Sequence, residues 1–157
     1  MYKPDYEPIF SAGRHEMSRE KFREKIVVGL GGVRRAKIWD EFCSKVLEVL
    51  CSHDICCEIW IDGSFITRCE EPDDIDASIM IDAAELDRMD DEAVNYLQLI
   101  DDCEKPFGDS LDIFLCIVYP KGHPNRDDFN DPDGWAKHWS REHNSKWLKG
   151  FVVISLR

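Results

Sequence analysis

Apolar residues recur along this chain with two different spacings. In residues 33–53 they return every three or four positions, which is typical of a helix with one face on a hydrophobic core. The residues of this stripe are Trp39, Phe42, Val46 and Val49 or Leu50. Shorter apolar runs that are bounded by polar residues predict strands. These strands span residues 57–62, 75–81, 111–119 and 151–156.

Capping residues and breaks in the pattern predict the remaining elements. Ser18 is expected to cap a helix that runs to residue 28 and ends at a glycine-rich segment. Two more helices are expected at residues 90–100 and 132–149, with a polar loop at 121–134 before the second. The run 111–119 is nearly continuous, which predicts the central strand of the sheet.

The order of these elements predicts an α+β fold with α/β-like character, in which a small mixed sheet carries helices mainly on one face. A chain of 157 residues suits one domain with a substantial core, so residues 1–157 are expected to form a single domain after an irregular lead-in, 1–13. No apolar run reaches the roughly 20 residues of a membrane span. The first residues also lack the layout of a signal peptide. We therefore expect a cytoplasmic protein that does not contact membranes.

The net charge of −12 is concentrated in the middle of the chain. Residues 51–120 contain 3 basic and 19 acidic residues, whereas residues 1–50 and 121–157 each carry a net charge of +2. An acidic centre suits divalent cations, and Lys and Arg from the two flanks can face phosphates. The alternative for many of these acids is a solvated surface. The overall acidity argues against a broad nonspecific nucleic-acid surface.

Seven cysteines without disulfide-framework spacing predict free thiols in a reducing compartment. Cys51, His53, Cys56 and Cys57 lie close enough in sequence to raise the question of zinc. However, no second pair has zinc-finger spacing, and adjacent cysteines point to opposite faces of a strand. Buried thiols are the preferred interpretation, and a zinc site is the alternative.

The candidate chemistry lies at the ends of three predicted strands. Asp74-Ile75-Asp76 opens the second strand, and residues two apart share a face, so Asp74 and Asp76 point together. Two carboxylates in one place repel each other unless a cation lies between them. Asp112, on the adjacent strand, would complete an oxygen cluster suited to Mg²⁺ or Mn²⁺.

Gly63-Ser64, at the end of the first strand, suits the opposite charge. A glycine where a strand turns into a helix lets backbone amides approach phosphate oxygens, and the helix N-terminus adds a favourable dipole. The Ser64 hydroxyl can donate to a β- or γ-phosphate. Four further acids surround the motif, which is too many for two metal ions, so several of them are interpreted as solvated loop residues and none is taken as a ligand. They are Asp62, Glu70, Glu71 and Asp73.

This combination resembles the polymerase-beta-type nucleotidyltransferase superfamily. The residues that carry the resemblance are Ile61-Asp62-Gly63-Ser64-Phe65, Asp74-Ile75-Asp76 and Leu111-Asp112-Ile113-Phe114. It implies the nucleotidyltransferase fold, with Gly63 and Ser64 binding the nucleotide and Asp74, Asp76 and Asp112 as catalytic and metal-binding residues. The chain is especially similar to a family of small uncharacterised bacterial proteins, which share an early Gly13-Arg14-His15 and a late Lys149-Gly150.

The resemblance implies an enzyme that moves an NMP group from an NTP to an acceptor hydroxyl and releases pyrophosphate. The acceptor would be a protein, an RNA or a small molecule. One alternative is an antitoxin-type minimal nucleotidyltransferase that modifies a toxin partner protein. Another is a noncatalytic nucleotide-binding or interaction module with the same fold.

The last predicted helix offers further cations. Arg141, Lys146 and Lys149 can clamp a triphosphate, but solubility and compensation of the helix dipole in the last turn are the preferred interpretation. Trp135, Trp139 and Trp147 are expected in the core rather than as a platform for a base.

Overall fold

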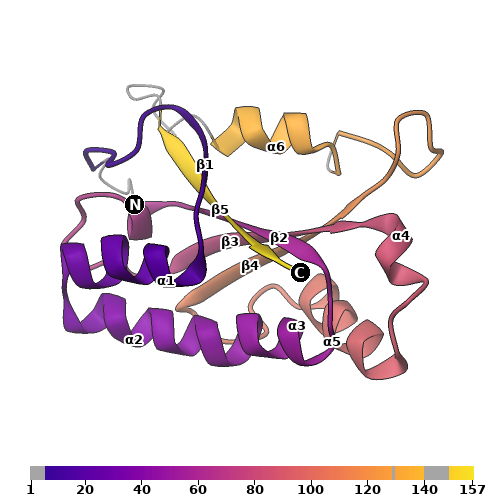
Figure 1. Ribbon diagram of the computed structural model, residues 1–157, viewed down its shortest axis with the longest axis horizontal. Helices are drawn as coiled ribbons and strands as arrows, with labels where there is room; N and C mark the ends of the chain where they lie inside the picture. Colours follow the sequence, from indigo (N-terminus) through magenta and orange to yellow (C-terminus); the bar gives the residue numbers. More distant parts are fainter. Residues whose placement is uncertain (1–5, 129, 140–148) are drawn as a thin grey trace.

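The computed structural model describes residues 6–128, 130–139 and 149–157, and its strands form one mixed five-stranded sheet (Figure 1). The strands are β1 (Gly13–Glu16), β2 (Cys57–Asp62), β3 (Ile75–Asp82), β4 (Leu111–Val118) and β5 (Gly150–Leu156). They lie in the order β1-β5-β2-β3-β4. β2 is antiparallel to both β3 and β5, whereas β1 with β5 and β3 with β4 are parallel pairs. The predicted α+β class is confirmed.

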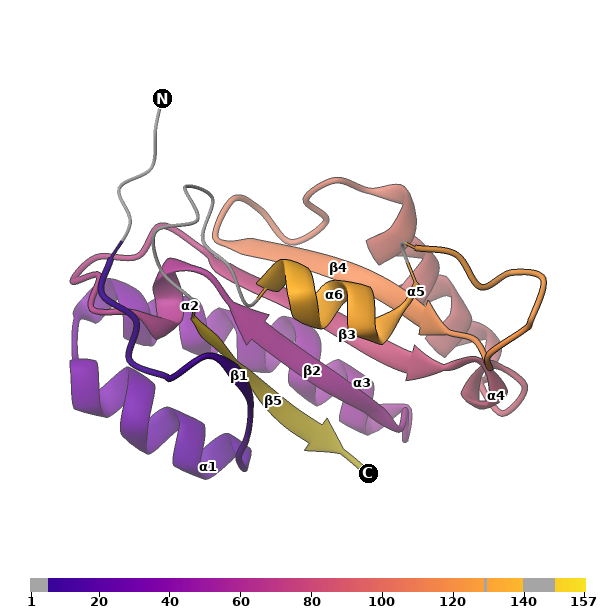
Figure 2. The ribbon, with the colours of Figure 1, turned by 90° about the horizontal axis from the view of Figure 1, so that it is seen from above.

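Most helices cover one face of the sheet, and α6 crosses the other (Figures 1 and 2). The first face carries α1 (Arg19–Phe22), α2 (Val33–Phe42), α3 (Glu48–Ser52) and α5 (Asp91–Asp102). The π-helical turns η1 (Arg23–Val28) and η2 (Cys43–Leu47) continue α1 and α2, so that α2, η2 and α3 form one long rod. α4 (Ala83–Leu86) is a short helix after β3, and α6 spans Pro132–Trp139. The predicted placement of helices mainly on one face is therefore correct.

The alternation of side chains along the strands divides the buried residues into two clusters. One set of alternate positions, such as Ile59, Ala77 and Val152, packs against the layer of α1, α2 and α5. The other set lies under α6. Its members are Trp60, Met80, Cys116, Phe151 and Val153, which form one cluster with Trp139. Any polar residue in step with this second set therefore lies on the α6 face of the sheet.

The first two helices agree with the sequence. The Ser18 hydroxyl accepts a hydrogen bond from the Lys21 N–H at 3.2 Å, so the predicted cap is confirmed. The predicted stripe is buried as well, with Trp39 at 1% and Leu50 at 0% exposure. A helix period is a strong signal when one face meets a core over several turns.

The prediction that residues 111–119 form the centre of the sheet is wrong. β4 is an edge strand, and β2 occupies the centre. Both faces of β4 are covered, since Ile113 packs in the main core and Cys116 lies under α6. A continuous apolar run therefore indicates that both faces of the strand are covered by other elements. It does not indicate that the strand has a neighbouring strand on each side.

Two predicted boundaries also differ. Gly13, assigned to the irregular lead-in, begins β1, which pairs in parallel with β5 from Gly150 onward. The helix expected over residues 132–149 is described only to Trp139, and Lys149 is not helical. Arg141, Lys146 and Trp147 lie outside the described residues.

Candidate functional site

Three aspartates lie side by side at one edge of the sheet. Asp62, the last residue of β2, pairs with Asp76 of β3, and Asp76 pairs with Asp112 of β4. Directly paired residues point to the same face, and here it is the α6 face because their neighbours in sequence enter the main core. Adjacent strands lie about 4.8 Å apart. We call Asp62, Asp76 and Asp112 the acid row.

Gly63 places the Gly-Ser turn directly against this row. Its φ of +78° lies in the left-handed region, which favours glycine. A Cβ at this position would overlap the Oδ2 atom of Asp76. The predicted phosphate-binding turn and the predicted carboxylate are therefore in contact, as the sequence motif requires.

The helix expected after Gly63 is absent from this part of the described chain. Ser64 begins η3 (Ser64–Ile66), a single 3₁₀ turn that the Thr67 N–H closes by donating to the Ser64 carbonyl at 3.2 Å. A macrodipole is a sum over many aligned peptide groups, so one turn contributes little. Any phosphate contact here depends on the backbone amides and the Ser64 hydroxyl.

Asp62 and Lys149 form a nearly buried ion pair beside the turn. Lys149 Nζ lies 2.9 Å from Asp62 Oδ2, and the two side chains are 13% and 9% exposed. Burial raises the pKa of Asp62, and the ammonium of Lys149 opposes this rise. The second oxygen, Oδ1, is buried and has no hydrogen-bond donor among the described residues.

This pair corrects two interpretations of the sequence. Asp62 is the buried end of β2 and no solvated loop residue, and Lys149, which is not itself helical, has Asp62 as its charge partner. A signal for Asp62 did exist: it stands two residues after Trp60 and therefore shares the face of that buried side chain. For Lys149, the partner could not be found without the pairing of β2 with β5.

Asp74 takes a different position from the other predicted ligands. It lies one residue before β3, is only 7% exposed, and stands outside the pairing that joins Asp76 to Asp112. Within the described residues, no three His, Cys, Asp or Glu side chains form a group that could hold a metal ion. The structure thus brings Asp76 and Asp112 together, and the ion that Asp74, Asp76 and Asp112 are expected to share stays a prediction.

Arg35 of α2 fixes the segment after the turn, a role that no pattern in the sequence indicates. The side chain is fully buried. Its guanidinium donates to the carbonyls of Phe65 at 3.3 Å, Thr67 at 3.5 Å and Cys69 at 2.5 Å, and to Gly31 at 3.2 Å in its own helix turn. Burial lowers the pKa of Arg35. A helix that packs on the sheet thereby holds the chain between the Gly-Ser turn and β3.

Gly13-Arg14-His15 and Lys149-Gly150 meet in the sheet although they lie at opposite ends of the sequence. Gly13 pairs with Gly150 at the start of β1 and β5. A Cβ on Gly150 would overlap the Ser11 carbonyl oxygen and lie 2.7 Å from the His15 ring. His15 itself places Nε2 2.7 Å from that carbonyl. This contact fixes the beginning of β5, and with it the backbone of Lys149.

The sequence profile of one protein family matches residues 4–155. Its description is a family of unknown function, DUF6932. The chain belongs to this family. The matched span contains the acid row, the Gly-Ser turn and Lys149. No curated protein and no solved structure matches the chain.

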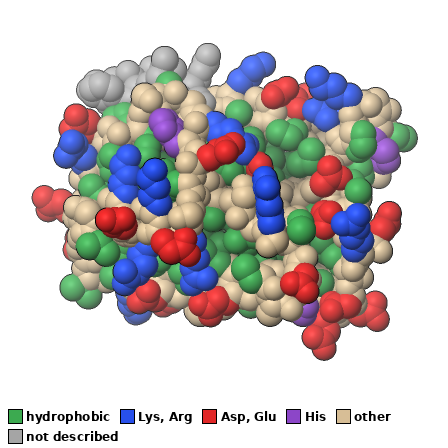
Figure 3. Space-filling view, viewed as in Figure 1, with side chains coloured by type: hydrophobic (Ala, Val, Ile, Leu, Met, Phe, Trp, Pro, Cys, Tyr) green, Lys and Arg blue, Asp and Glu red, His purple; other side chains and the backbone are tan. Residues whose placement is uncertain are grey.

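The acidic middle of this DUF6932 protein is partly neutralised by its basic flanks. Figure 3 shows Lys and Arg mixed with Asp and Glu over the face in view. Among the described residues, three ion pairs join a basic residue of the flanks to an acid of the middle segment: Arg14–Glu58, Arg34–Asp73 and Lys149–Asp62. Arg68, which follows the Gly-Ser turn, pairs with Glu7 at 3.0 Å. The first two of these pairs and Arg68–Glu7 are more exposed than Lys149–Asp62.

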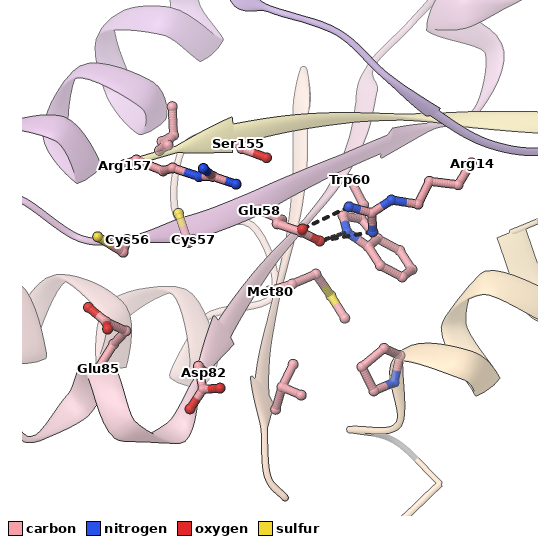
Figure 4. Close-up of a pocket in the computed structure, with 13 residues that line it drawn as sticks. Arg14, Cys56, Cys57, Glu58, Trp60, Met80, Asp82, Glu85, Ser155 and Arg157 are labelled. Atoms are coloured by element: carbon pink, nitrogen blue, oxygen red, sulfur yellow. Dashed lines mark hydrogen bonds and ion pairs between the residues drawn. The ribbon is translucent and has the colours of Figure 1, made fainter.

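A pocket lies on the α6 face at the end of β2 opposite to the acid row (Figure 4). Its volume is about 400 Å³. Arg14 donates to both oxygens of Glu58, at 2.9 and 2.7 Å, and the Trp60 Nε1–H donates to Glu58 at 2.9 Å. These polar groups are satisfied by one another. The acid row is therefore the stronger candidate for chemistry in this DUF6932 protein.

No described helix has the length and apolar character needed to cross a membrane.

The cysteines divide into buried and exposed thiols. Cys57 is buried, as the sequence interpretation holds, but Cys51 and Cys56 are exposed thiols. Burial raises the pKa of Cys57 to about 12. Cys56, just before β2, and Cys57, its first residue, thus differ in burial.

Proposed function

We propose that this protein transfers a nucleoside monophosphate from an NTP to an acceptor hydroxyl and releases pyrophosphate. One observation carries the proposal: the Gly63-Ser64 turn lies against Asp76, at the middle of the acid row. Phosphate-binding backbone next to paired carboxylates is an arrangement suited to phosphoryl-group chemistry, in which positioning and charge compensation dominate.

The arrangement of strands supports the same proposal. The acid row joins three adjacent strands, with Asp76 and Asp112 on a parallel pair. The resemblance to the polymerase-beta-type superfamily implies a third aspartate on a strand beside the Asp-x-Asp strand, and Asp76 and Asp112 lie on such neighbouring strands. We therefore extend the proposal to the nucleotidyltransferase fold itself.

The donor atoms at this site fit a hard cation. Asp76 and Asp112 offer carboxylate oxygens only, both half-buried and within reach of solvent. They would hold Mg²⁺ or Mn²⁺, and Asp74, two residues before Asp76, would be the third ligand. Proteins usually hold Mg²⁺ by one or two carboxylates together with substrate phosphates, so the nucleotide would complete the coordination. A bound ion would stabilise negative charge on the attacking and leaving oxygens.

The chain's own residues would position the reactants. The amides of the turn and the Ser64 hydroxyl would hold the β- and γ-phosphates. Asp112 would accept the proton of the acceptor hydroxyl. The hydroxyl oxygen would bond to the α-phosphorus as the bond between the α-phosphorus and pyrophosphate breaks. The acceptor would be a protein, an RNA or a small molecule, and a toxin's side-chain hydroxyl is one case of the first.

Substitution of the acid row tests the proposal. Asp76→Asn and Asp112→Asn should each reduce transfer of the labelled nucleoside monophosphate by about 100-fold or more, since each removes a charge that acts on the transition state. Asp82→Asn is the matched control, because Asp82 lies on the same face of β3 at the opposite end and is exposed. The assay uses each α-labelled NTP with Mg²⁺ and host lysate, and circular dichroism verifies folding. Equal rates in wild type and Asp76→Asn would refute the proposal.

A second candidate is a noncatalytic nucleotide-binding module. The observation in its favour is that Lys149 already compensates the charge of Asp62 without any metal ion. This candidate predicts that an NTP binds the purified protein while pyrophosphate is never released, whatever the metal concentration or acceptor.

A further inference from the structure

The position of the Lys149 ammonium is fixed from two sides. β2 and β5 are antiparallel, with Ile61 opposite Val152, so the end of β2 meets the beginning of β5. The contact of Gly150 with Ser11 and His15 holds the first residue of β5. The Lys149 side chain therefore starts from a defined backbone position and ends 2.9 Å from Asp62 Oδ2.

Stability alone is a weak reason for this pair. Removing an ammonium and a carboxylate from water costs more than their attraction returns in many buried pairs, and an apolar pair is often as stable. Here both side chains are nearly buried, at 13% and 9% exposure. The pKa of Asp62 is raised by burial in spite of Lys149, and its Oδ1 lacks a donor in the described part of the chain. A functional role of the Lys149 ammonium therefore explains the Lys149–Asp62 pair better than a contribution to the stability of the fold.

The ammonium also lies where the proposed nucleotide would place its phosphates. Asp62 directly precedes Gly63, so its partner Lys149 stands beside the Gly-Ser turn. An ammonium has three N–H donors, and Asp62 Oδ2 accepts from one of them. A lysine is a compact point charge that suits phosphate oxygens.

We infer that Lys149 binds a phosphate group of the nucleotide, and that Asp62 is the positioning residue that holds the ammonium in place. The inference rests on the proposed function for the identity of the phosphate donor. It assigns the ion pair a role at the turn, in addition to the roles of Asp76 and Asp112 at the cation.

The test measures phosphate binding without metal and without turnover. The probe is inorganic tripolyphosphate in the presence of a chelator, titrated calorimetrically into the full chain. Lys149→Met should weaken binding by about tenfold, the effect of losing one charge-assisted hydrogen bond, and Lys149→Arg should restore part of it. The matched control is Lys137→Met, which removes the same charge from the exposed side of α6 and should leave affinity unchanged.

A double-mutant cycle isolates the positioning role of Asp62. Asp62→Asn should weaken tripolyphosphate binding by about threefold, because the ammonium loses its anchor and samples other positions. In the double variant with Lys149→Met, Asp62→Asn should add no further loss. A purely structural role would lower the denaturation midpoint of these variants without this coupling in affinity.

Two results would overturn the inference: tripolyphosphate affinity that is the same in wild type and Lys149→Met, and no binding by the wild type. In the first case, tighter Mn²⁺ binding by Lys149→Met would show that Lys149 competes with the cation instead. The proposed function can fail separately. If phosphate binding depends on Lys149 but no NTP supports transfer, the inference about Lys149 stands and the proposed enzymatic activity is refuted.

Discussion

Gly63 carries two constraints that act on different atoms. Its φ of +78° is a backbone constraint, since a side chain in the left-handed region costs about 1–2 kcal/mol. The missing Cβ is a packing constraint, because Asp76 Oδ2 occupies its place. Gly122 has a φ of +84° and no heavy atom within 4 Å of a built Cβ. The pair of glycines therefore separates backbone strain from displacement of the carboxylate.

Substitution of the two glycines by alanine should give different results. Gly122→Ala should lower the free energy of unfolding by about 1–2 kcal/mol, from backbone strain alone. Gly63→Ala should lower it by about 2–5 kcal/mol, because overpacking against Asp76 adds to the strain. It should also abolish the proposed transfer by moving that carboxylate. Urea denaturation of both variants measures the difference, and equal losses would mean that Asp76 moves away freely.

At this scale the sequence predicts residues whose neighbours along the chain define their role. Gly63, Ser64, Asp76 and Asp112 follow from a motif with fixed spacing, and the structure places the turn and these two aspartates together. The spacing of Asp62 from Trp60 indicates its face, but its ion pair escapes because Lys149 lies far away in sequence. Lys149 escapes for the same reason. Pairings between distant segments leave no local pattern for a single sequence to reveal.

At the scale of elements, α2 acts on the site through Arg35. The guanidinium donates to three carbonyls between residues 65 and 69. Among the described residues no carboxylate forms an ion pair with it, so the backbone carbonyl dipoles compensate the buried charge. The neighbouring Arg34 is half-exposed and pairs with Asp73 at 2.7 Å. Two adjacent arginines thus have opposite environments in one helix.

Removal of each arginine side chain should show this contrast. Arg35→Met should lower the free energy of unfolding by about 3 kcal/mol or more, because each buried carbonyl left without a donor costs about 1–3 kcal/mol. Arg34→Met should change it by about 0–1 kcal/mol, as for exposed ion pairs. Chemical denaturation measures both values. A small effect of Arg35→Met would show that water or other donors replace the guanidinium.

Strands are predicted well where they are apolar and poorly where pairing alone forms them. β2, β3 and β5 agree with the sequence to within a residue or so of each expected boundary. β1 is four residues long, with exposed residues alternating with half-buried ones, so it carries no hydrophobic signal. It exists because β5 offers an edge to pair with. The order of strands likewise depends on pairing, which explains the wrong placement of β4.

At the scale of the whole molecule, the seven thiols report on the integrity of the fold. Cys43, Cys57, Cys69 and Cys116 are buried, and three further thiols are exposed. Burial raises the pKa of Cys116 to about 11 and that of Cys57 to about 12. Buried thiols therefore stay protonated and shielded at pH values at which exposed ones react.

Alkylation at pH 8 should separate the two classes. Cys51, Cys56 and Cys103 should react in the native protein, and the other four thiols should react only when denaturant unfolds the chain. Mass spectrometry measures the number of alkyl groups on the chain as the reaction proceeds. Peptide mapping assigns them to individual cysteines, and early labelling of Cys57 in native protein would contradict its burial in β2.

The place of β5 between β1 and β2 has a consequence for synthesis on the ribosome. β1 and β2 are both translated long before β5, yet neither is the other's neighbour in the sheet. β1 therefore leaves the exit tunnel without a partner and has to wait until the last strand emerges. Contacts between such distant segments form slowly because a long loop must close first. The phosphate site that we propose is thus incomplete in the nascent chain until β5 has emerged.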